Sequence, residues 1–432
     1  MRTTAKFAND AMASSEGKKE QAKAAVMGTS IYGKFNLKTD DGKSTDGGTP
    51  RHGRIYDPSL AQKPGGLKAE EMLLGVKFAH LSCTDDSPGH LATPAPNTLE
   101  AVKLIVGGSE EEAKKPLSTI LKDHFNLTMD CWIDESGVRK GRPVDTQGYI
   151  ASNDEMIVLS YRFTTTMTDW MTNLSMTTSE WEPDVDEKIG HAGWCSCLDG
   201  YFTSILGIKE GKPRVHTGFY NNFLSSLPYV KKHIVEKLTA PNAKPMKVYV
   251  CGCSLGAAIA TVATCYLLLE LPLEDLPHKI ISVTAGCPRV CAPKMKERMM
   301  ERMKVLRPLD KAVICRLVYN EDVVPHIPFG VSGFRHLDKL VYITTEGDVI
   351  VGPYLEGAKK FNEVCNVVRT FWGTKKSEKE AAESMARQAE AEGKTPFEVE
   401  LEKTPQPIKD HMPYWYMTHL GNLLKKEKGP AS

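Results

Sequence analysis

Apolar runs that suit strands alternate with runs of helical spacing through the middle of the chain. Four short runs are apolar and rich in β-branched or aromatic residues, which is typical of buried strands: residues 156–161, 246–251, 279–284 and 312–319. Apolar residues recur at helical spacing in residues 68–80, 98–106, 222–238 and 293–305. This alternation predicts an α/β fold with a mostly parallel central sheet and helices on both faces. Residues 340–344 and 349–351, joined by a Gly-Asp turn, predict an antiparallel hairpin at one edge.

A long uncharged run, residues 248–269, joins a strand pattern to a helix pattern. Its 22 residues are enough to span a bilayer on length alone. Its first part is β-branched or aromatic, however, and its last part is rich in Ala and Leu, which favours a strand followed by a helix. Gly252, Ser254 and Gly256 form a G-x-S-x-G turn between the two. A strand, this turn and a helix make a nucleophile elbow, in which the Ser hydroxyl projects beside the helix N-terminus. Ser254 is therefore the predicted nucleophile.

Composition and charge narrow the class of protein. The chain has 432 residues, with 55 Lys and Arg against 54 Asp and Glu scattered along it, so we expect no nucleic-acid partner. The 11 Cys lie mostly in apolar runs without zinc-type spacing, which favours buried reduced thiols and no metal site. The N-terminus lacks the apolar segment of a secretory signal, so the expected location is cytoplasmic.

The domain organisation follows from where these patterns begin and end. Residues 1–65 are polar and predict a flexible N-terminal tail. Residues 66–425 are expected to form one α/β domain with insertions near 181–213 and 374–405. Much of the second insertion is charged and rich in Ala without a wide apolar face, which predicts a solvated helix.

A Ser nucleophile requires a His to accept its proton and a carboxylate to orient that His. The strand pattern at 312–319 is followed by Asp322, the position after a later strand that the acid occupies in α/β-hydrolases, and Glu321 is the alternative. The His residues after Asp322 are His326, His336, His411 and His419. Spacing alone leaves His336 and His411 as equal candidates for the base.

Residues from about 145 to 420 resemble the class 3 lipase family, which includes fungal triacylglycerol lipases and feruloyl esterases. The similar segments are 145–149 (DTQGY), 161–164 (YRFT), 215–219 (VHTGF), 285–290 (AGCPRV) and 320–325 (NEDVVP). Phe334-Arg335-His336 resembles a non-catalytic motif of the family, whereas residues 410–414 (DHMPY) resemble its terminal motif with the catalytic His. The resemblance therefore implies an α/β-hydrolase fold and assigns the base to His411.

The same resemblance implies an oxyanion hole and a lid. Thr164 and the backbone N–H of Leu255 would donate to the oxyanion. Trp170, Met171 and Leu174 would form the apolar face of the lid, although packing of a helix on the core accounts for them equally well. Phe163 departs from the family, since it stands where relatives have Gly, and it would line the acyl pocket or crowd the oxyanion site. Cys253 departs too, in place of the usual His in the elbow.

Together the motifs predict a serine carboxylic-ester hydrolase, a lipase that acts on acylglycerols or other lipid esters through an acyl-enzyme. No metal or organic cofactor is required. The expected partners are the lipid substrate and, transiently, a membrane or lipid-droplet surface touched by the lid. The alternative is a lipase-fold protein that binds lipid or a partner with little or no turnover, as Phe163 and the insertions would favour.

Overall fold

The computed structural model describes residues 54–63, 65–84, 96–139, 142–163, 177–183, 211–328, 333–338, 340–352, 384, 387–404 and 406–428. Most of the expected tail and much of both expected insertions lie outside these ranges.

The described strands form a nine-stranded sheet in the order β1-β11-β10-β9-β8-β7-β4-β3-β2 and a separate pair, β5 and β6. In chain order they are β1 (Arg54–Ile55), β2 (Thr128–Arg139), β3 (Arg142–Ser152), β4 (Met156–Tyr161), β5 (Thr178–Glu180), β6 (Arg214–His216), β7 (Lys247–Cys253), β8 (Lys279–Ala285), β9 (Ala312–Tyr319), β10 (Leu340–Ile343) and β11 (Val349–Val351). The five strands β4, β7, β8, β9 and β10 are parallel to their neighbours within this group. Antiparallel pairs flank them, including the predicted hairpin of β10 and β11. The predicted parallel core of the sheet is thus confirmed.

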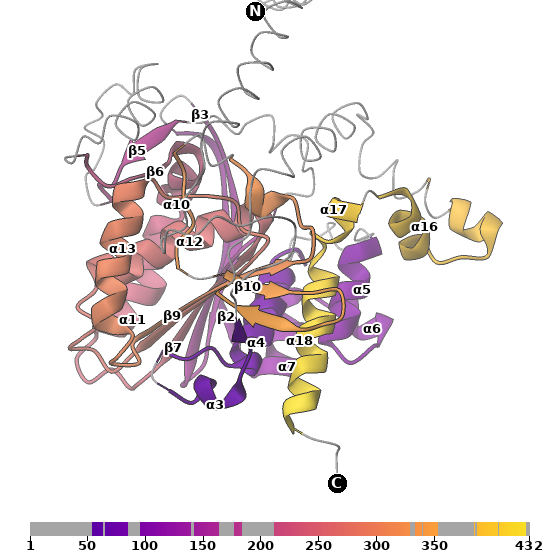
Figure 1. Cartoon of the computed structure of the whole chain (residues 1–432), viewed down its shortest axis with the longest axis horizontal. Helices are drawn as coiled ribbons and strands as arrows, with labels where there is room; N and C mark the ends of the chain where they lie inside the picture. Colours follow the sequence, from indigo (N-terminus) through magenta and orange to yellow (C-terminus); the bar gives the residue numbers. More distant parts are fainter. Residues whose placement is uncertain are drawn as a thin grey trace, which may run out of the picture.

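Helices cover both faces of this sheet (Figure 1). They are α3 (Pro58–Ala61), α4 (Ala69–Leu81), α5 (Pro96–Ile105), α6 (Glu110–Ala113), α7 (Leu117–Phe125), α10 (Thr217–Val230), a π-helical turn (Lys231–Val235), α11 (Glu236–Thr239), α12 (Ser254–Glu270), α13 (Pro293–Leu306), a 3₁₀ turn (Val324–His326), α16 (Pro396–Lys403), α17 (Gln406–Lys409) and α18 (Pro413–Lys428). Helices α10, α12 and α13 lie on one face, and α4, α5 and α18 lie on the other.

Strand β7 shows why both faces must be covered. Val248 and Val250 point into the apolar cluster under α12, whereas Tyr249 and Cys251 point into the cluster under α4. Successive side chains of a strand point to opposite faces, so a strand that is apolar throughout is stable only between two layers. The uncharged run 248–269 accordingly forms β7 and α12. Within the described residues, no helix combines the length and apolar character needed to cross a membrane.

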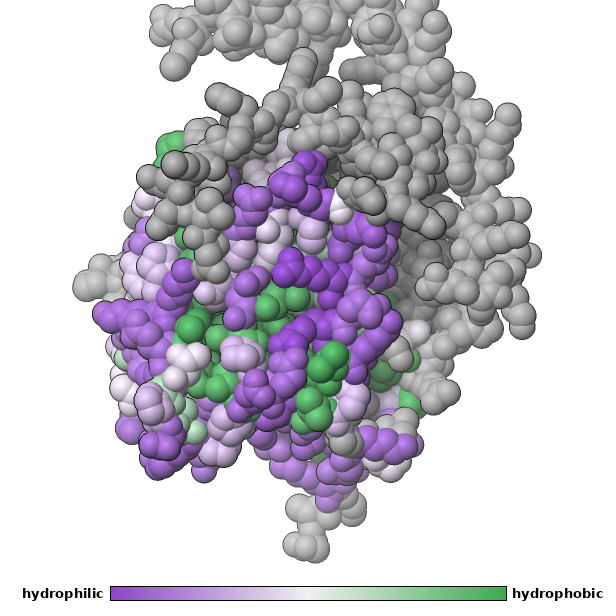
Figure 2. Space-filling view, turned by 90° about the vertical axis from the view of Figure 1, so that its left-hand side faces the viewer, coloured by the Kyte–Doolittle hydropathy of each residue, from purple (hydrophilic) through white to green (hydrophobic). Residues whose placement is uncertain are grey.

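Helix α13 follows the predicted amphipathic pattern. Met295, Met299 and Met303 recur every four residues, and all three are buried in the cluster that includes α12. The other side of α13 carries Lys and Glu residues, and polar side chains dominate much of the face on that side of the molecule (Figure 2). Apolar side chains show between them, and Val305 and Leu309 at the end of this helix are about half exposed.

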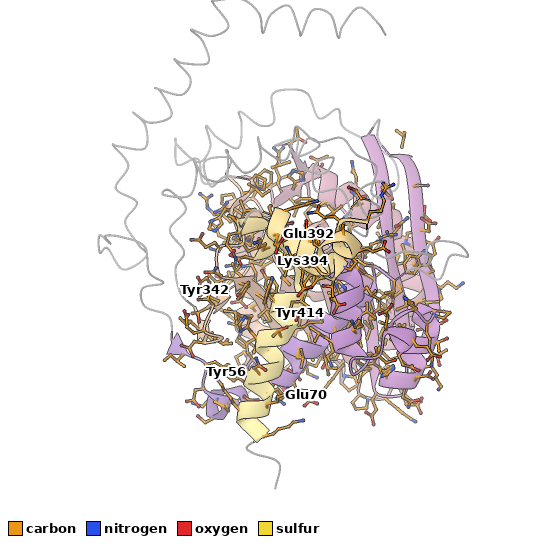
Figure 3. All side chains as sticks on the ribbon, turned by 90° about the vertical axis from the view of Figure 1, so that its right-hand side faces the viewer. Tyr56, Glu70, Tyr342, Glu392, Lys394 and Tyr414 are labelled. Atoms are coloured by element: carbon orange, nitrogen blue, oxygen red, sulfur yellow. The ribbon has the colours of Figure 1, made fainter. Side chains whose placement is uncertain are left out.

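Residues 54–63 lie within the expected tail, yet the backbone of residues 54–56 joins the sheet. Strand β1 pairs with β11, and the Tyr56 amide donates a hydrogen bond to the Val349 carbonyl at 2.7 Å. The Tyr56 hydroxyl in turn accepts from the amide of Ala69 at the start of α4. Tyr56 and Tyr342 of β10 are both visible in Figure 3.

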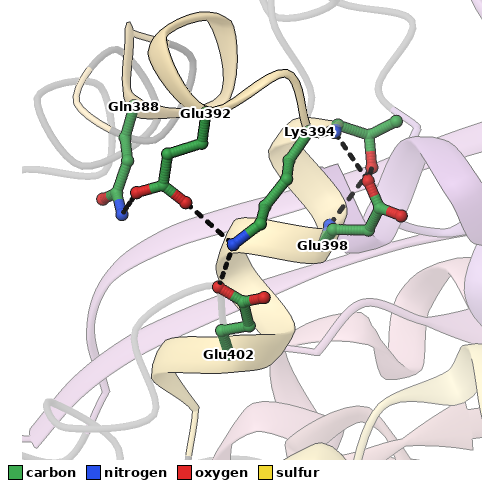
Figure 4. A network of polar contacts seen from close by, with 6 residues as sticks. Gln388, Glu392, Lys394, Glu398 and Glu402 are labelled. Atoms are coloured by element: carbon green, nitrogen blue, oxygen red, sulfur yellow. Dashed lines mark hydrogen bonds and ion pairs between the residues drawn. The ribbon is translucent and has the colours of Figure 1, made fainter.

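The described end of the second expected insertion forms a polar network on α16 and the turn before it (Figure 4). The Lys394 ammonium lies 2.9 Å from carboxylate oxygens of both Glu392 and Glu402. Thr395 and Glu398 make reciprocal side-chain-to-amide hydrogen bonds, the capping box that begins a helix. Val399 of the same helix is fully buried, so this part of the insertion also has an apolar contact with the domain.

Candidate active site

The candidate nucleophile lies at a strained turn between β7 and α12. Ser254 has a backbone φ of 54°, which is unfavourable for a residue with a side chain. A Cβ on Gly252 would come within 2.3 Å of the Gly256 backbone, and a Cβ on Gly256 within 2.2 Å of the Tyr161 carbonyl oxygen. Both positions therefore exclude any side chain. The G-x-S-x-G spacing is required by this close approach of three backbone segments.

The candidate base and acid form a buried hydrogen-bonded pair. Asp322 follows β9 and is fully buried. His411 lies between α17 and α18, 89 residues later in the chain, and its Nδ1 is 2.9 Å from both carboxylate oxygens of Asp322. A carboxylate accepts only, so Nδ1 carries the proton and Nε2 presents a lone pair. A neutral His in this tautomer can accept a proton from a hydroxyl.

Two further groups hold the Asp322 carboxylate. The Tyr416 hydroxyl donates to Oδ2 at 2.5 Å and accepts from the Tyr319 amide, and the Val324 amide donates to Oδ1 at 2.9 Å. Burial raises the pKa of Tyr416 well above its usual value, which keeps its hydroxyl protonated as a donor. Tyr416 is not among the site residues predicted from the sequence. Its position five residues after His411, in the apolar first turns of α18, was the available signal.

A second carboxylate, that of Asp410, links the loop of His411 to the end of β9 by hydrogen bonds. Asp410 is fully buried and accepts hydrogen bonds from the Asn320 side chain at 2.8 Å and from the Glu321 amide at 3.1 Å. Gln406 donates to its other oxygen at 2.7 Å. Burial raises the pKa of Asp410, while these donors partly oppose that effect. Asp410 thereby ties the segment before His411 to the segment before Asp322.

Strand register places Ser254 beside Gly286, the residue that the His411 ring covers. Cys253, which precedes Ser254, pairs with Ala285 of the neighbouring parallel strand, and Ala285 precedes Gly286. A Cβ on Gly286 would lie 2.5 Å from ring atoms of His411 and 2.7 Å from Asp322 Oδ2. Ser254 and Gly286 therefore lie at equivalent positions on adjacent strand ends, with the His411 ring directly over Gly286.

Comparison with known proteins finds one matching protein family. Residues 158–332 match the family described as Lipase (class 3). This match covers less than half of the chain. The matched range includes Ser254 and Asp322, whereas His411 lies beyond it. The predicted α/β-hydrolase fold agrees with the parallel strands and with the strand-turn-helix elbow at Ser254.

One curated protein and several solved structures are similar to this chain. The chain is 27% identical over 241 residues to phospholipase A(1) DAD1, chloroplastic, from Arabidopsis thaliana. That match covers 52% of this chain and 47% of the relative, so the chain spans about half of the relative's length. Among solved structures, lipase II from Rhizopus niveus is 19% identical with a TM-score of 0.42, covering 67% of this chain and 88% of that one. Mono- and diacylglycerol lipase from Aspergillus oryzae is 17% identical with a TM-score of 0.43, covering 67% and 87%.

Of the remaining site residues expected from the sequence, only Leu255 and Phe163 lie within the described ranges. Leu255 is buried in the first turn of α12, directly after Ser254. Phe163 is half-buried and packs on the cluster under α4, with its ring centroid 5.9 Å from that of His80. Thr164, Trp170, Met171 and Leu174 lie outside the described residues. Within the described part of the chain, no group of His, Cys, Asp or Glu has a metal-binding arrangement.

His336 and His419, which were also candidates for the base, have different surroundings. His336 Nε2 lies 2.8 Å from the Pro325 carbonyl oxygen, to which it donates. Burial lowers the pKa of His336 well below its usual value. The ring of His419 stacks on Tyr319 at a centroid distance of 5.0 Å. Of the two His left open by spacing, His411 is the one hydrogen-bonded to Asp322.

We expect Gly286→Ala to lower kcat by at least about 100-fold, because the added methyl group would displace the His411 ring, and small displacements of catalytic groups cost about this much. Gly107→Ala is the matched control. Gly107 also has a positive φ, but its Cβ would meet nothing within 4 Å. Both variants should lose some thermal stability from the left-handed backbone, and only Gly286→Ala should lose activity. Equal kcat values in the two variants would contradict the position assigned to His411.

Proposed function

We propose that this protein hydrolyses carboxylic esters of lipids through Ser254, His411 and Asp322. The observation that carries the proposal is the buried His411–Asp322 hydrogen bond beside the strained elbow of Ser254. The match of residues 158–332 to a lipase family and the name of the curated relative, a phospholipase A(1), support a lipid ester as the substrate. Acylglycerols are the substrate class that we propose within this group.

The proposed reaction proceeds through an acyl-enzyme. Ser254 Oγ attacks the ester carbonyl carbon while His411 Nε2 takes the hydroxyl proton, and Asp322 stabilises the resulting imidazolium. The carbonyl oxygen becomes an oxyanion, for which the Leu255 amide at the start of α12 and Thr164 are the proposed donors. Collapse of this intermediate breaks the ester bond, and the alcohol leaves with the proton from His411. Water then attacks the acyl-enzyme with the same proton transfers and releases the acid.

Access to the site is proposed to involve an apolar lid that contains Trp170, Met171 and Leu174. The formal charge of +1 gives little attraction to anionic lipid surfaces, so contact with a membrane or lipid droplet would depend on these apolar side chains. Phe163 is proposed to line the same entrance.

Covalent labelling with a fluorophosphonate tests the proposal, because this probe reacts with a Ser only where base and oxyanion donors are assembled. We expect one label per chain, on Ser254 in a peptide map. Ser254→Ala should lose the label, whereas Ser59→Ala, which changes an exposed Ser of α3, should retain it. A folded wild-type protein that takes up no label would contradict the enzyme and favour a lipase-fold protein that binds lipid without turnover.

A further inference from the structure

A small interior cavity lies between α12 and the sheet, on the side of β8 and β9. It is lined by Thr261 and Thr264 of α12, by Ser282 and Thr284 of β8, and by Arg316 of β9, together with residues of the loops at 287–290 and 336–337. The centre of a water-sized sphere can occupy about 10 Å³ of it, which is room for one water molecule or one small ion. The cavity is therefore very small, and its lining combines these polar side chains with apolar ones such as Val290 and Ile314.

Arg316 is the unusual member of this lining. Arg316 is only 9% exposed, and its buried Nε has no hydrogen-bond partner. Within the described residues, no carboxylate forms an ion pair with it. Asp338 acts on Arg316 electrostatically, but its carboxylate is paired with Arg307. Buried charged groups are nearly always paired, because an isolated buried charge is expensive.

The charge of Arg316 persists at neutral pH. Burial lowers the pKa of Arg316 to about 10, which still leaves the guanidinium protonated at pH 7. Among the described residues, the thiol and the imidazole that line the cavity do not supply the missing negative charge. Burial raises the pKa of the Cys287 thiol to about 12, so it is neutral, and burial together with the Arg316 charge lowers the pKa of His336, which is neutral as well.

A hydroxyl donor stands beside the guanidinium. Thr284 pairs with Arg316 across β8 and β9, so the two side chains project from the same face of the sheet. The Thr284 hydroxyl is 3.5 Å from the Cys315 carbonyl oxygen, a long contact from which its proton can readily turn to another acceptor. An acceptor in the cavity would thus meet a cation and a hydroxyl proton together.

We propose that this cavity binds one small monovalent anion of the size of chloride, held by Arg316 and Thr284. The volume excludes phosphate and the carboxylate of a fatty acid. The site is separate from the Ser254 elbow, although Cys287 in its lining directly follows Gly286. A bound anion would stabilise the packing of α12 on β8 and β9, the strands that lead to Gly286 and Asp322.

Thermal unfolding of the full chain in sodium chloride and in sodium gluconate of equal ionic strength tests the proposal. A ligand that binds only the folded state raises Tm with its concentration, so we expect Tm to be a few degrees higher in chloride and the difference to saturate. Arg316→Met, which keeps the volume and removes the charge, should abolish the difference. Arg298→Met, at an exposed position of α13, should retain it.

A Tm that is the same in both salts for the wild type, or a chloride effect that survives in Arg316→Met, would overturn the proposal. Crystals of the wild type grown in sodium bromide supply a second measurement if Arg316→Met does not fold. We expect an anomalous peak for bromide beside Arg316, and an ordered water without anomalous signal would refute the anion. None of these readouts depends on ester hydrolysis, so they remain valid if the proposed function is wrong.

Discussion

Ser254→Ala is expected to lower kcat for nitrophenyl esters by roughly 10⁵- to 10⁶-fold, because removal of a nucleophile that acts together with its base abolishes the whole covalent route. KM should change little, since the Ser hydroxyl contributes little to substrate binding. Ala keeps the Cβ of Ser, so the strain at φ 54° stays the same and the variant should fold with a similar Tm. Initial rates with short- and long-chain esters and a thermal melt are the measurements.

The control for this prediction is Ser59→Ala, whose rates should equal those of the wild type. Equal rates for Ser254→Ala and the wild type would refute the proposed nucleophile. A residual rate in Ser254→Ala above that of free solution is compatible with the mechanism, because oxyanion donors and substrate binding act without the nucleophile.

Asp322→Asn is expected to lower kcat by about 10⁴-fold, the second largest effect. The Asn amide would donate to His411 Nδ1, which would move the ring proton to Nε2 and leave no lone pair for the Ser254 hydroxyl. The Tyr416 hydroxyl and the Val324 amide, which now donate to two carboxylate oxygens, would compete for one acceptor. Steady-state kinetics and Tm should be measured together, because some loss of stability is expected as well.

Glu321→Gln and Asp348→Asn are the controls for the acid. Glu321 was the alternative acid, and its backbone amide contacts Asp410, so replacement of its side chain should leave kcat nearly unchanged. Asp348 is an exposed carboxylate in the turn between β10 and β11, and its variant is a control for the loss of an exposed negative charge. High activity in Asp322→Asn with a large loss in Glu321→Gln would transfer the acid role to Glu321.

Short sequence patterns, the apolar runs and the G-x-S-x-G motif, predicted the central strands and the elbow. Strands β7, β8 and β9 carry buried apolar residues on both faces, and a chain segment of that kind is stable only when two helical layers cover it. The turn at Ser254 needs Gly at positions 252 and 256 because backbone atoms come too close for any Cβ. Part of this requirement comes from Tyr161 on β4, but the residues that meet it lie within five positions, so the pattern is visible in the sequence.

The flanking strands were much harder to predict. Strand β2 carries Asp130, Asp134 and Glu135 and is partly exposed, so it lacks the apolar alternation of a core strand. It is held by its antiparallel ladder with β3. Strand β1 is two residues long and depends on its pairing with β11, almost 300 residues away in the sequence. Neither pairing leaves a local pattern.

The choice between His336 and His411 shows most clearly how local sequence patterns differ from long-range contacts. A Ser at an elbow needs an acid and a His after it, since that requirement is chemical, and the strand pattern narrowed the acid to the end of β9. Spacing left His336 and His411 open and the family resemblance favoured His411, but the contact of His411 with Asp322 depends on the folded chain. The contact joins segments 89 residues apart through Gly286, Tyr416 and the buried Asp410, and no spacing rule encodes a distance that depends on how α18 packs beside β9.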